Sequence, residues 1–280
     1  MPREFTPTSR IRCNSALDVH GCSRHGRPSV TIDGGHSPAL VRKDTVTPPT
    51  PFSSPAASAN LDALAQRALR LAQLGDRTII GIAGSPGAGK TTLARALTSR
   101  ITELLQSSDA AAAPAVHLPM DGYHLANATL DRLGNYDRKG AIDTFDGWGF
   151  VALVERVLAE QDHTVYAPGF DREVDEGIAG EIAIPAGTSI VIVEGNYLLV
   201  DEKPWSALRG LFDESWFCAT SDAERLRRLV DRHERHGRTR DAAYDWAVNV
   251  DGANARLIEA SKSRADLVVS GRDASVASRD

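Results

Sequence analysis

The stretch from Thr78 to Thr91 decides the fold, and it reads Thr-Ile-Ile-Gly-Ile-Ala-Gly-Ser-Pro-Gly-Ala-Gly-Lys-Thr. Its first six residues are apolar enough for a buried strand, and the residues from Thr91 to Leu105 keep the spacing of an amphipathic helix. Between strand and helix lies the phosphate-loop pattern G-x-x-x-x-G-K-[ST], which is met by Gly84, Gly89, Lys90 and Thr91. A strand, this loop and a helix in that order predict a nucleotide-binding α/β domain.

The residue types in this loop suit the binding of phosphate. Glycines reach the positive φ values that turn successive N–H groups inward, and the new helix adds free donors and a positive dipole end. Lys90 supplies a point charge for the outer phosphates, and the Thr91 hydroxyl suits Mg²⁺, which prefers oxygen ligands. We therefore predict that ATP and Mg²⁺ bind here, with the nucleotide held by Gly84, Ser85, Gly87, Ala88, Gly89, Lys90, Thr91 and Thr92.

Composition narrows the class of protein. Of the 280 residues, 42% are hydrophobic and 25% are charged, which is ordinary for a globular chain. The net charge of −5 disfavours nucleic acid as the main partner. No apolar run approaches the roughly 20 residues that span a bilayer, so we expect no membrane partner. The three cysteines are too few for a disulfide framework, and together with the lack of an apolar signal segment they favour a cytoplasmic location.

The first part of the chain differs from the rest. Residues 1–58 are rich in Pro, Ser, Thr and Gly, and we predict that they are disordered, with one phosphate-loop domain over 59–280. A transit peptide and a start codon further downstream stay open as other interpretations of this segment. A metal site is disfavoured, because no common zinc spacing is matched by Cys13, His20, Cys22, His25 and His36.

Further along, predicted strands alternate with predicted helices. Such alternation predicts a parallel sheet covered on both faces, a three-layer α/β sandwich. The predicted strands lie at 78–83, 115–120, 164–166, 189–194, within 211–218 and at 267–269, and the predicted helices lie at 59–74, 91–105, 149–160, 222–236 and 240–261.

Two acidic residues follow predicted strands at the edge where ligands bind. Asp121 comes directly after the second strand, where it can accept a proton from a substrate hydroxyl, although a cap for the next turn is the alternative. Glu194 ends the most apolar strand, where it is expected to ligate Mg²⁺ or its water shell together with Thr91. The carboxyl ends of neighbouring parallel strands share one edge, so we expect both acids near the phosphate loop.

An arginine-rich helix is predicted after Asp222. About half of its charges are expected to form a solvated, salt-bridged face. Arg228 and Arg232 are spaced i, i+4 on one face, and Gly237 breaks the helix beside Arg238. A hinged helix with arginines can close over the phosphates as a lid, so we expect Arg228 and Arg232, with Lys90 and Asp121, to act in catalysis and Arg238 to bind the nucleotide.

Together these motifs resemble the phosphoribulokinase/uridine kinase family. The resemblance rests on the phosphate loop, Met120–His124, Arg138–Gly140 with Thr144–Asp146, and Glu194–Tyr197, and it extends from about Leu61 to Val269. It implies a kinase that transfers the γ-phosphate of ATP to an alcohol, with Asp121 as the base, Glu194 at the metal and the arginine helix as the lid. A nucleotide-dependent regulator or ATPase without a small acceptor is the alternative, and an RNA-interacting protein is disfavoured by the acidic balance.

The acceptor is not fixed by the sequence. Gly140 stands where uridine–cytidine kinases carry an Asp for the ribose, and the residues after it depart from pantothenate kinases. Lys139 and Arg172 would suit an acidic or multiply hydroxylated acceptor, and His124 could equally pack in the core. A homodimer is one option for the oligomeric state. The predicted acceptor pocket is built from Tyr123, His124, Lys139, Phe145, Phe170, Asp171, Arg172 and Asn196.

Overall fold

The computed structural model describes residues 51–109 and 111–277. Most of the segment predicted to be disordered, with its Cys/His cluster, lies outside the described residues, and so does residue 110. The first described helix begins at Pro55, with the Ser54 side chain accepting a hydrogen bond from the Ala57 backbone N–H as its N-cap. Proline needs no hydrogen-bond partner at the first helical position. The last residues of the 1–58 segment are therefore helical, and the helix starts four residues before the predicted start at Ala59.

Most of the remaining elements follow the predicted alternation, with short 3₁₀ turns (η) between them, but the helix at Asn127–Leu133 and the strand at Glu176–Ile184 were not predicted. The bounds of the elements are α1 Pro55–Ala72, β1 Thr78–Ala83, α2 Lys90–Ser108, β2 Val116–Pro119, η1 Met120–Tyr123, α3 Asn127–Leu133, η2 Tyr136–Arg138, η3 Ile142–Thr144, α4 Gly147–Ala159, β3 Val165–Asp171, β4 Glu176–Ile184, β5 Ile190–Gly195, η4 Trp205–Gly210, β6 Glu214–Ala219, α5 Asp222–Arg235, α6 Arg240–Glu259, η5 Lys262–Arg264 and β7 Leu267–Ser270.

The central sheet has five strands in the order β2-β5-β1-β6-β7, and every neighbouring pair is parallel. This confirms the predicted parallel sheet. The strand that carries the phosphate loop, β1, lies in the middle, and Ile82 of β1 is in register with Glu194 of β5. Glu194 is also in register with Pro119 at the end of β2. The sheet thus brings the ends of β1, β5 and β2 to one edge.

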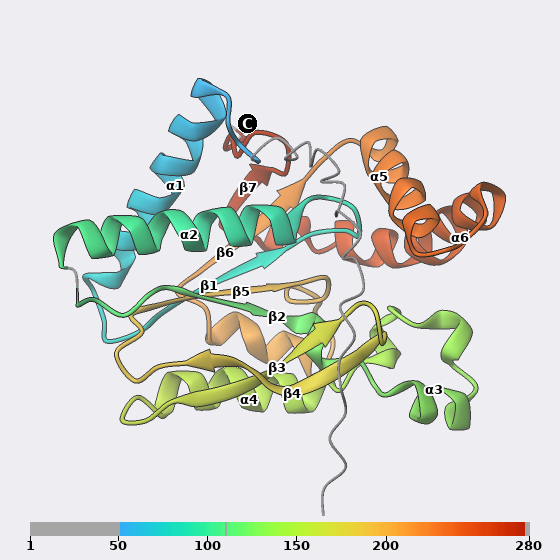
Figure 1. Cartoon of the computed structure of the whole chain (residues 1–280), viewed down its shortest axis with the longest axis horizontal. Coiled ribbons are helices and arrows are strands. Elements are labelled where there is room, and N and C mark those ends of the chain that lie inside the picture. Colours follow the sequence, from blue (N-terminus) through green and yellow to red (C-terminus); the bar gives the residue numbers. More distant parts are fainter. Residues whose placement is uncertain (1–50, 110, 278–280) are drawn as a thin grey trace, which may run out of the picture. The chain divides into compact units, whose positions relative to one another are not determined.

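Helices cover both faces of this sheet (Figure 1). Along β1, Ile80 and Ile82 pack in one apolar cluster with α1 and α2, whereas Ile79 and Ala83 pack in the other with α4. Successive side chains of a strand point to opposite faces, so a strand buried on both faces reads as a continuous apolar run. A third, small cluster joins α5 to α6 through Leu229, Val230, Ala243 and Ala247.

An antiparallel hairpin, β3–β4, lies outside the central sheet. The sequence predicted only a short strand at 164–166, and β4 was missed. Its isoleucines, at 178, 182 and 184, share one face of the strand, but Gly177 and Gly180 interrupt the run, and within β4 only Ile184 is buried. The hairpin packs closely on η1, because a Cβ added to Gly122 would lie 2.2 Å from the Pro168 carbonyl oxygen. This contact brings the hairpin beside Asp121.

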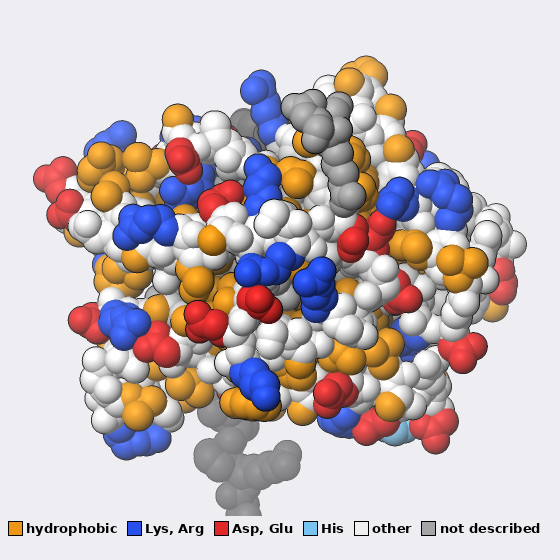
Figure 2. Space-filling view, turned by 180° about the vertical axis from the view of Figure 1, so that it is seen from behind, with side chains coloured by type: hydrophobic (Ala, Val, Ile, Leu, Met, Phe, Trp, Pro, Cys, Tyr) orange, Lys and Arg blue, Asp and Glu red, His pale blue; other side chains and the backbone are white. Residues whose placement is uncertain are grey.

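The surface carries charges of both signs. On the face shown in Figure 2, Lys and Arg side chains are interspersed with Asp and Glu, and hydrophobic atoms lie between them. Over the described residues, no helix combines the length and apolarity needed to cross a membrane.

Candidate active site

The phosphate loop follows β1 and has the backbone that its glycines allow. Gly84 has φ +151° and Gly89 has φ +102°, which is the region that disfavours residues with a Cβ. A Cβ at Gly84 would meet the Cys218 carbonyl oxygen at 2.4 Å, and one at Gly89 would meet the Gly271 carbonyl oxygen at 2.8 Å. The α2 helix begins at Lys90, directly after Gly89. The predicted strand–loop–helix order is therefore confirmed, and the N-terminus of α2 faces the loop.

A buried cluster of charges lies where this loop meets β5. The Lys90 ammonium donates a hydrogen bond to the Ser85 carbonyl at 3.2 Å and lies 3.9 Å from a Glu194 carboxylate oxygen. Glu194 is only 3% exposed. Burial alone would raise the pKa of Glu194, but His117, Lys90 and Thr91 together outweigh it and hold the pKa below its ordinary value. Glu194 is therefore ionised, and it presents a negative charge beside the loop.

The oxygens at this point suit a hard divalent cation. The Thr91 hydroxyl donates to Glu194 Oε2 at 3.2 Å, so a hydroxyl and a carboxylate oxygen lie together at the start of α2. Mg²⁺ is commonly held by one or two protein oxygens, with waters and nucleotide phosphates completing its shell. The two residues predicted for the metal thus fit Mg²⁺, and the described residues contain no group of three or more His, Cys, Asp or Glu that could hold another metal.

Sequence reasoning missed His117 beside this cluster. Its Nε2 atom lies 3.6 Å from Glu194 Oε2 and is buried without a hydrogen-bond partner among the described residues. His117 belongs to β2 and is in register with Ile192 of β5. Its neighbours in the sequence, Val116 and Leu118, are both apolar. A polar residue inside a short apolar strand was the signal that could have identified it.

Ser85, predicted to bind the nucleotide, has a side-chain partner within the protein. Its hydroxyl donates to Glu259 Oε1 at 2.7 Å, and Ser85 is fully buried. Glu259 is the last residue of α6, so this hydrogen bond joins the phosphate loop to the helix that follows the arginine-rich segment. Thr92, also predicted for the nucleotide, is exposed in the first turn of α2.

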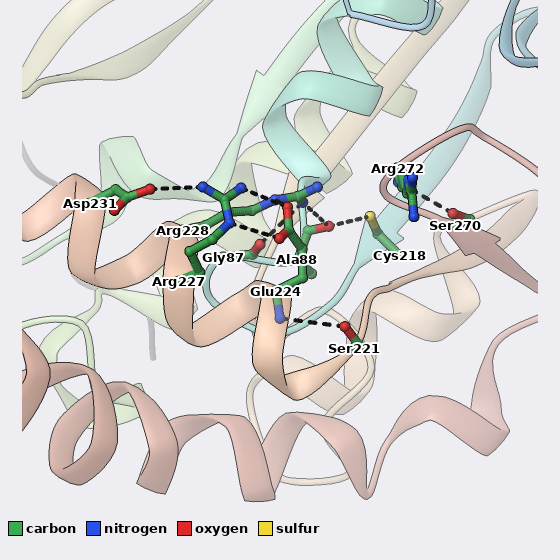
Figure 3. Close-up of polar contacts among 10 residues, drawn as sticks. All are labelled: Gly87, Ala88, Cys218, Ser221, Glu224, Arg227, Arg228, Asp231, Ser270 and Arg272. Atoms are coloured by element: carbon green, nitrogen blue, oxygen red, sulfur yellow. Dashed lines mark hydrogen bonds and ion pairs between the residues drawn. The ribbon is translucent and has the colours of Figure 1, made fainter.

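The arginine-rich helix α5 lies over the loop (Figure 3). Arg228 directs its guanidinium at the carbonyl oxygens of Gly87 and Ala88, at 3.4 and 3.3 Å, and Glu224 holds the same side chain at 2.7 Å. Arg227 shares Glu224 but points along the helix to Asp231. Arg227 therefore belongs to the predicted salt-bridged face of α5, whereas the next residue, Arg228, faces the phosphate loop.

Arg232 and Arg238 occupy different surroundings. Burial lowers the pKa of Arg232, and the charges that act on it include Asp251, Arg172 and Asp121. Arg232 therefore lies near the predicted base, and within the described chain its guanidinium has no recorded hydrogen bond or ion pair. Arg238, predicted to bind the nucleotide, stacks over the Trp246 ring of α6 at 3.8 Å.

Asp121 lies in η1, the turn that follows β2 directly. Its Oδ2 atom accepts a hydrogen bond from Arg172 at 3.1 Å, and its side chain is 26% exposed, so solvent reaches the carboxylate. Arg172 comes from the turn between β3 and β4. The structure thus joins the predicted base to one of the residues predicted for the acceptor, although 51 positions separate them in sequence.

The aromatic residues predicted for the acceptor form a packed group. The His124 ring lies between the rings of Phe145 and Phe170, with centroids 4.0 and 4.7 Å away. Burial lowers the pKa of His124, although Asp121 raises it, and His124 Nδ1 lies 2.7 Å from the Asp121 backbone oxygen. A neutral ring that donates from Nδ1 satisfies this arrangement. The packing interpretation of His124 is therefore the one that the geometry favours, and Tyr123 packs edge-on against Phe150.

Two other predicted acceptor residues form hydrogen bonds within the protein. Lys139 binds Asn127 and Asp175 rather than facing open space. Asp171 accepts hydrogen bonds from the backbone N–H groups of Glu173 and Val174 and so caps the hairpin turn. Asn196 is half-buried directly after β5.

Comparison with known proteins agrees with this geometry. Residues 79–276 match the phosphoribulokinase/uridine kinase family. A uridine kinase from Clostridium tetani is 30% identical over 199 residues, which cover 68% of this chain and 85% of that protein. A candidate uridine kinase from Schizosaccharomyces pombe is 31% identical over 214 residues, covering 74% of this chain and 89% of that protein. The solved structure of a candidate fructose transport system kinase from Silicibacter sp. TM1040 is 38% identical, with a TM-score of 0.66 over 74% of this chain and 98% of that one.

The family match covers the sheet, the phosphate loop and the arginine-rich helix together, and kinases of this family use ATP to phosphorylate small metabolites. The chain therefore belongs to the phosphoribulokinase/uridine kinase family and is a phosphate-loop kinase.

Proposed function

We propose that the protein transfers the γ-phosphate of ATP to a hydroxyl group of a small, acidic or multiply hydroxylated metabolite, with Asp121 as the general base. The observation that carries this proposal is the place of Asp121. Its carboxylate follows β2, the strand next to Glu194, at the same sheet edge as the phosphate loop. A regulator that only hydrolyses or senses a nucleotide has no need of a second, solvent-accessible carboxylate at this edge.

The proposed reaction divides the site into two parts. Lys90 and the loop N–H groups hold the phosphates, and Arg228 meets charge that develops on the transferred group. Thr91 and Glu194 would hold Mg²⁺, which neutralises phosphate charge when bound. Asp121 takes the proton of the acceptor hydroxyl, whose oxygen bonds to the γ-phosphorus as the bond to the bridging oxygen of ADP breaks.

The charges beside Asp121 support an acidic or polar acceptor. Arg172 pairs with this carboxylate, and Arg232, which has no ion pair among the described residues, is acted on by its charge. Gly140 offers no side chain for a ribose: its φ is +100°, and its carbonyl accepts from Tyr197 Oη at 2.6 Å and Asn254 Nδ2 at 3.3 Å. A residue with a Cβ would be strained there. These features favour a sugar-like or acidic acceptor over a nucleoside, in line with the name of the Silicibacter relative.

The first test is Asp121→Asn with a panel of acceptors. ADP release from ATP and Mg²⁺ is measured with uridine, pantothenate, glycerate and fructose, and we expect at least one to accelerate it. The variant should lose about 10²–10⁴-fold in transfer, the usual contribution of a general base, and should keep its affinity for ATP. Asp137→Asn, at an exposed acid in η2, is the matched control and should behave as the wild type.

Two outcomes would overturn the proposal. Full transfer by the Asp121→Asn variant removes Asp121 as the base. ATP turnover that no acceptor accelerates would instead favour the ATPase or regulator that the sequence left as the alternative.

A further inference from the structure

Lys139 is the best placed of the predicted acceptor residues to have another role. Its side chain is 11% exposed, and its ammonium donates to Asn127 Oδ1 at 2.5 Å and to Asp175 Oδ2 at 2.8 Å. It also donates to the backbone oxygen of Asp175. These three bonds use all three hydrogens of the ammonium group. Lys139 therefore has no donor left for a substrate while these contacts hold.

The contacts of Lys139 converge on residues 171–176, which we call the hairpin tip. Asn127 reinforces the same point, since its side-chain amide donates to the Asp175 backbone oxygen at 3.2 Å and its backbone N–H donates to Glu176 Oε1 at 2.9 Å. Asp175 has φ +56°, so the backbone turns sharply where Lys139 holds it. Two segments far from the hairpin in sequence thus fix one end of the tip.

The other end of the hairpin tip carries Arg172. Its guanidinium meets the Asp121 carboxylate, yet its side chain is 49% exposed and has no other hydrogen bond or ion pair recorded in the described residues. A half-exposed arginine on a turn loses side-chain entropy when it is held in one geometry, so an isolated pair of this kind is weak. A fixed tip lowers that cost, because the backbone beneath Arg172 is already in place.

From these contacts we propose that Lys139 is a positioning residue: it anchors the hairpin tip through Asp175 and Asn127 and so seats Arg172 against Asp121. This inference rests on the proposed function of Asp121 and Arg172 at the acceptor side. It replaces the prediction that Lys139 contacts the acceptor. Lys139 then affects acceptor binding only indirectly: it holds Asp175, and Asp175 fixes the hairpin tip that carries Arg172.

Kinetics with paired variants test this path. Lys139→Met and Asp175→Asn remove the ion pair, and Asn tolerates the positive φ of position 175. Each should raise the KM of the best acceptor among uridine, pantothenate, glycerate and fructose by about tenfold, the loss typical of one charged hydrogen bond, and leave the KM of ATP unchanged. Arg138→Met removes an exposed neighbour whose ion pair within the described residues is with Asp143, and it should match the wild type.

A double variant separates positioning from direct contact. If Lys139 acts through Arg172, then Lys139→Met combined with Arg172→Met should be no worse than Arg172→Met alone, because residues on one path are not additive. KM increases that multiply in the double variant would show that Lys139 meets the acceptor itself, and this would overturn the inference.

Hydrogen exchange gives a readout that does not depend on the reaction. Backbone amides of the hairpin tip should exchange faster in Lys139→Met than in the wild type or in Arg138→Met, with ADP and Mg²⁺ present. Unchanged exchange at the tip would overturn the anchor, whatever the transfer rate. If Asp121→Asn keeps full transfer while Lys139→Met releases the tip, the base assignment fails and the anchor stands.

Discussion

The nucleotide side and the acceptor side of this site are built in different ways. On the nucleotide side, the phosphate loop is a continuous stretch of chain with a buried carboxylate, Glu194, one strand away. On the acceptor side, Asp121 is partly exposed and meets Arg172 from a separate hairpin. Backbone geometry determines the first region, whereas side-chain ion pairs between distant segments determine the second.

This difference has an energetic consequence. Ion pairs between exposed side chains contribute roughly 0–1 kcal/mol each, whereas breaking a buried pair leaves a charge without compensation and costs several times more. The nucleotide side should therefore keep its shape without ligand. The acceptor side should depend on a few anchors, and substitutions there should change acceptor kinetics more than stability.

Among substitutions that test the difference between the two sides, the largest loss of activity should come from replacing Arg228 on the nucleotide side. Replacing it by Met removes the only guanidinium of α5 recorded on the loop carbonyls in the described chain, and we expect kcat to fall about 10²–10³-fold, as for the loss of one transition-state donor. Arg227→Met is the matched control, since Arg227 shares Glu224 but faces Asp231. Steady-state kinetics at saturating ATP measure both, and equal losses in the two variants would remove Arg228 from the proposed catalytic role.

Much of the nucleotide side could be predicted from the sequence because its information is local. The spacing of Gly84, Gly89 and Lys90 encodes a loop whose dihedrals follow from the residue types, and the apolar run before Glu194 encodes a buried strand. The parallel sheet followed from the same periodicity. In these segments the residues that bind the ligand also determine the local backbone, so the sequence pattern was sufficient to predict both.

The acceptor side could be predicted only in part, because its contacts join residues far apart in sequence. The sequence placed Asp121 at a strand end and named Arg172, but it gave no sign that the two would meet. Lys139 was predicted for the acceptor because its charge would suit an acidic or multiply hydroxylated molecule, and only the fold shows its contact with Asp175. The mostly exposed strand β4, which leads the chain away from this tip, has its few isoleucines separated by glycines, so its strand pattern was too weak to reveal the hairpin.

A smaller effect on the nucleotide side should come from the hydrogen bond between Ser85 and Glu259. An acid at the C-terminal end of a helix opposes the helix dipole, so Glu259 in this place gains its stabilisation from Ser85. Glu259→Ala should raise the KM of ATP about tenfold, in keeping with a charged hydrogen bond of roughly 1.5 kcal/mol, and leave the acceptor KM unchanged.

Combination with Ser85→Ala shows whether the loop and α6 are coupled. If the hydroxyl serves Glu259, the double variant should be no worse than either single one. KM increases that multiply in the double variant would instead indicate that the Ser85 hydroxyl contacts the nucleotide directly. Glu155→Ala, at an exposed acid of α4, is the control for the removal of one negative charge.

The smallest effect concerns the pH dependence of stability on the acceptor side. Burial lowers the pKa of His124 from its ordinary value of 6.5, so below that pH the unfolded chain binds a proton that the folded protein does not. Stability from this residue is therefore complete above pH 6.5 and is lost as the pH falls toward the folded pKa, at up to about 1.4 kcal/mol per pH unit. His124→Phe keeps the stacking between Phe145 and Phe170 but cannot titrate. Measured by urea unfolding between pH 7.5 and 5.5, stability should fall less steeply in this variant than in the wild type. Parallel slopes would mean that His124 binds its proton equally in the folded and unfolded chain, and the burial effect would then be absent.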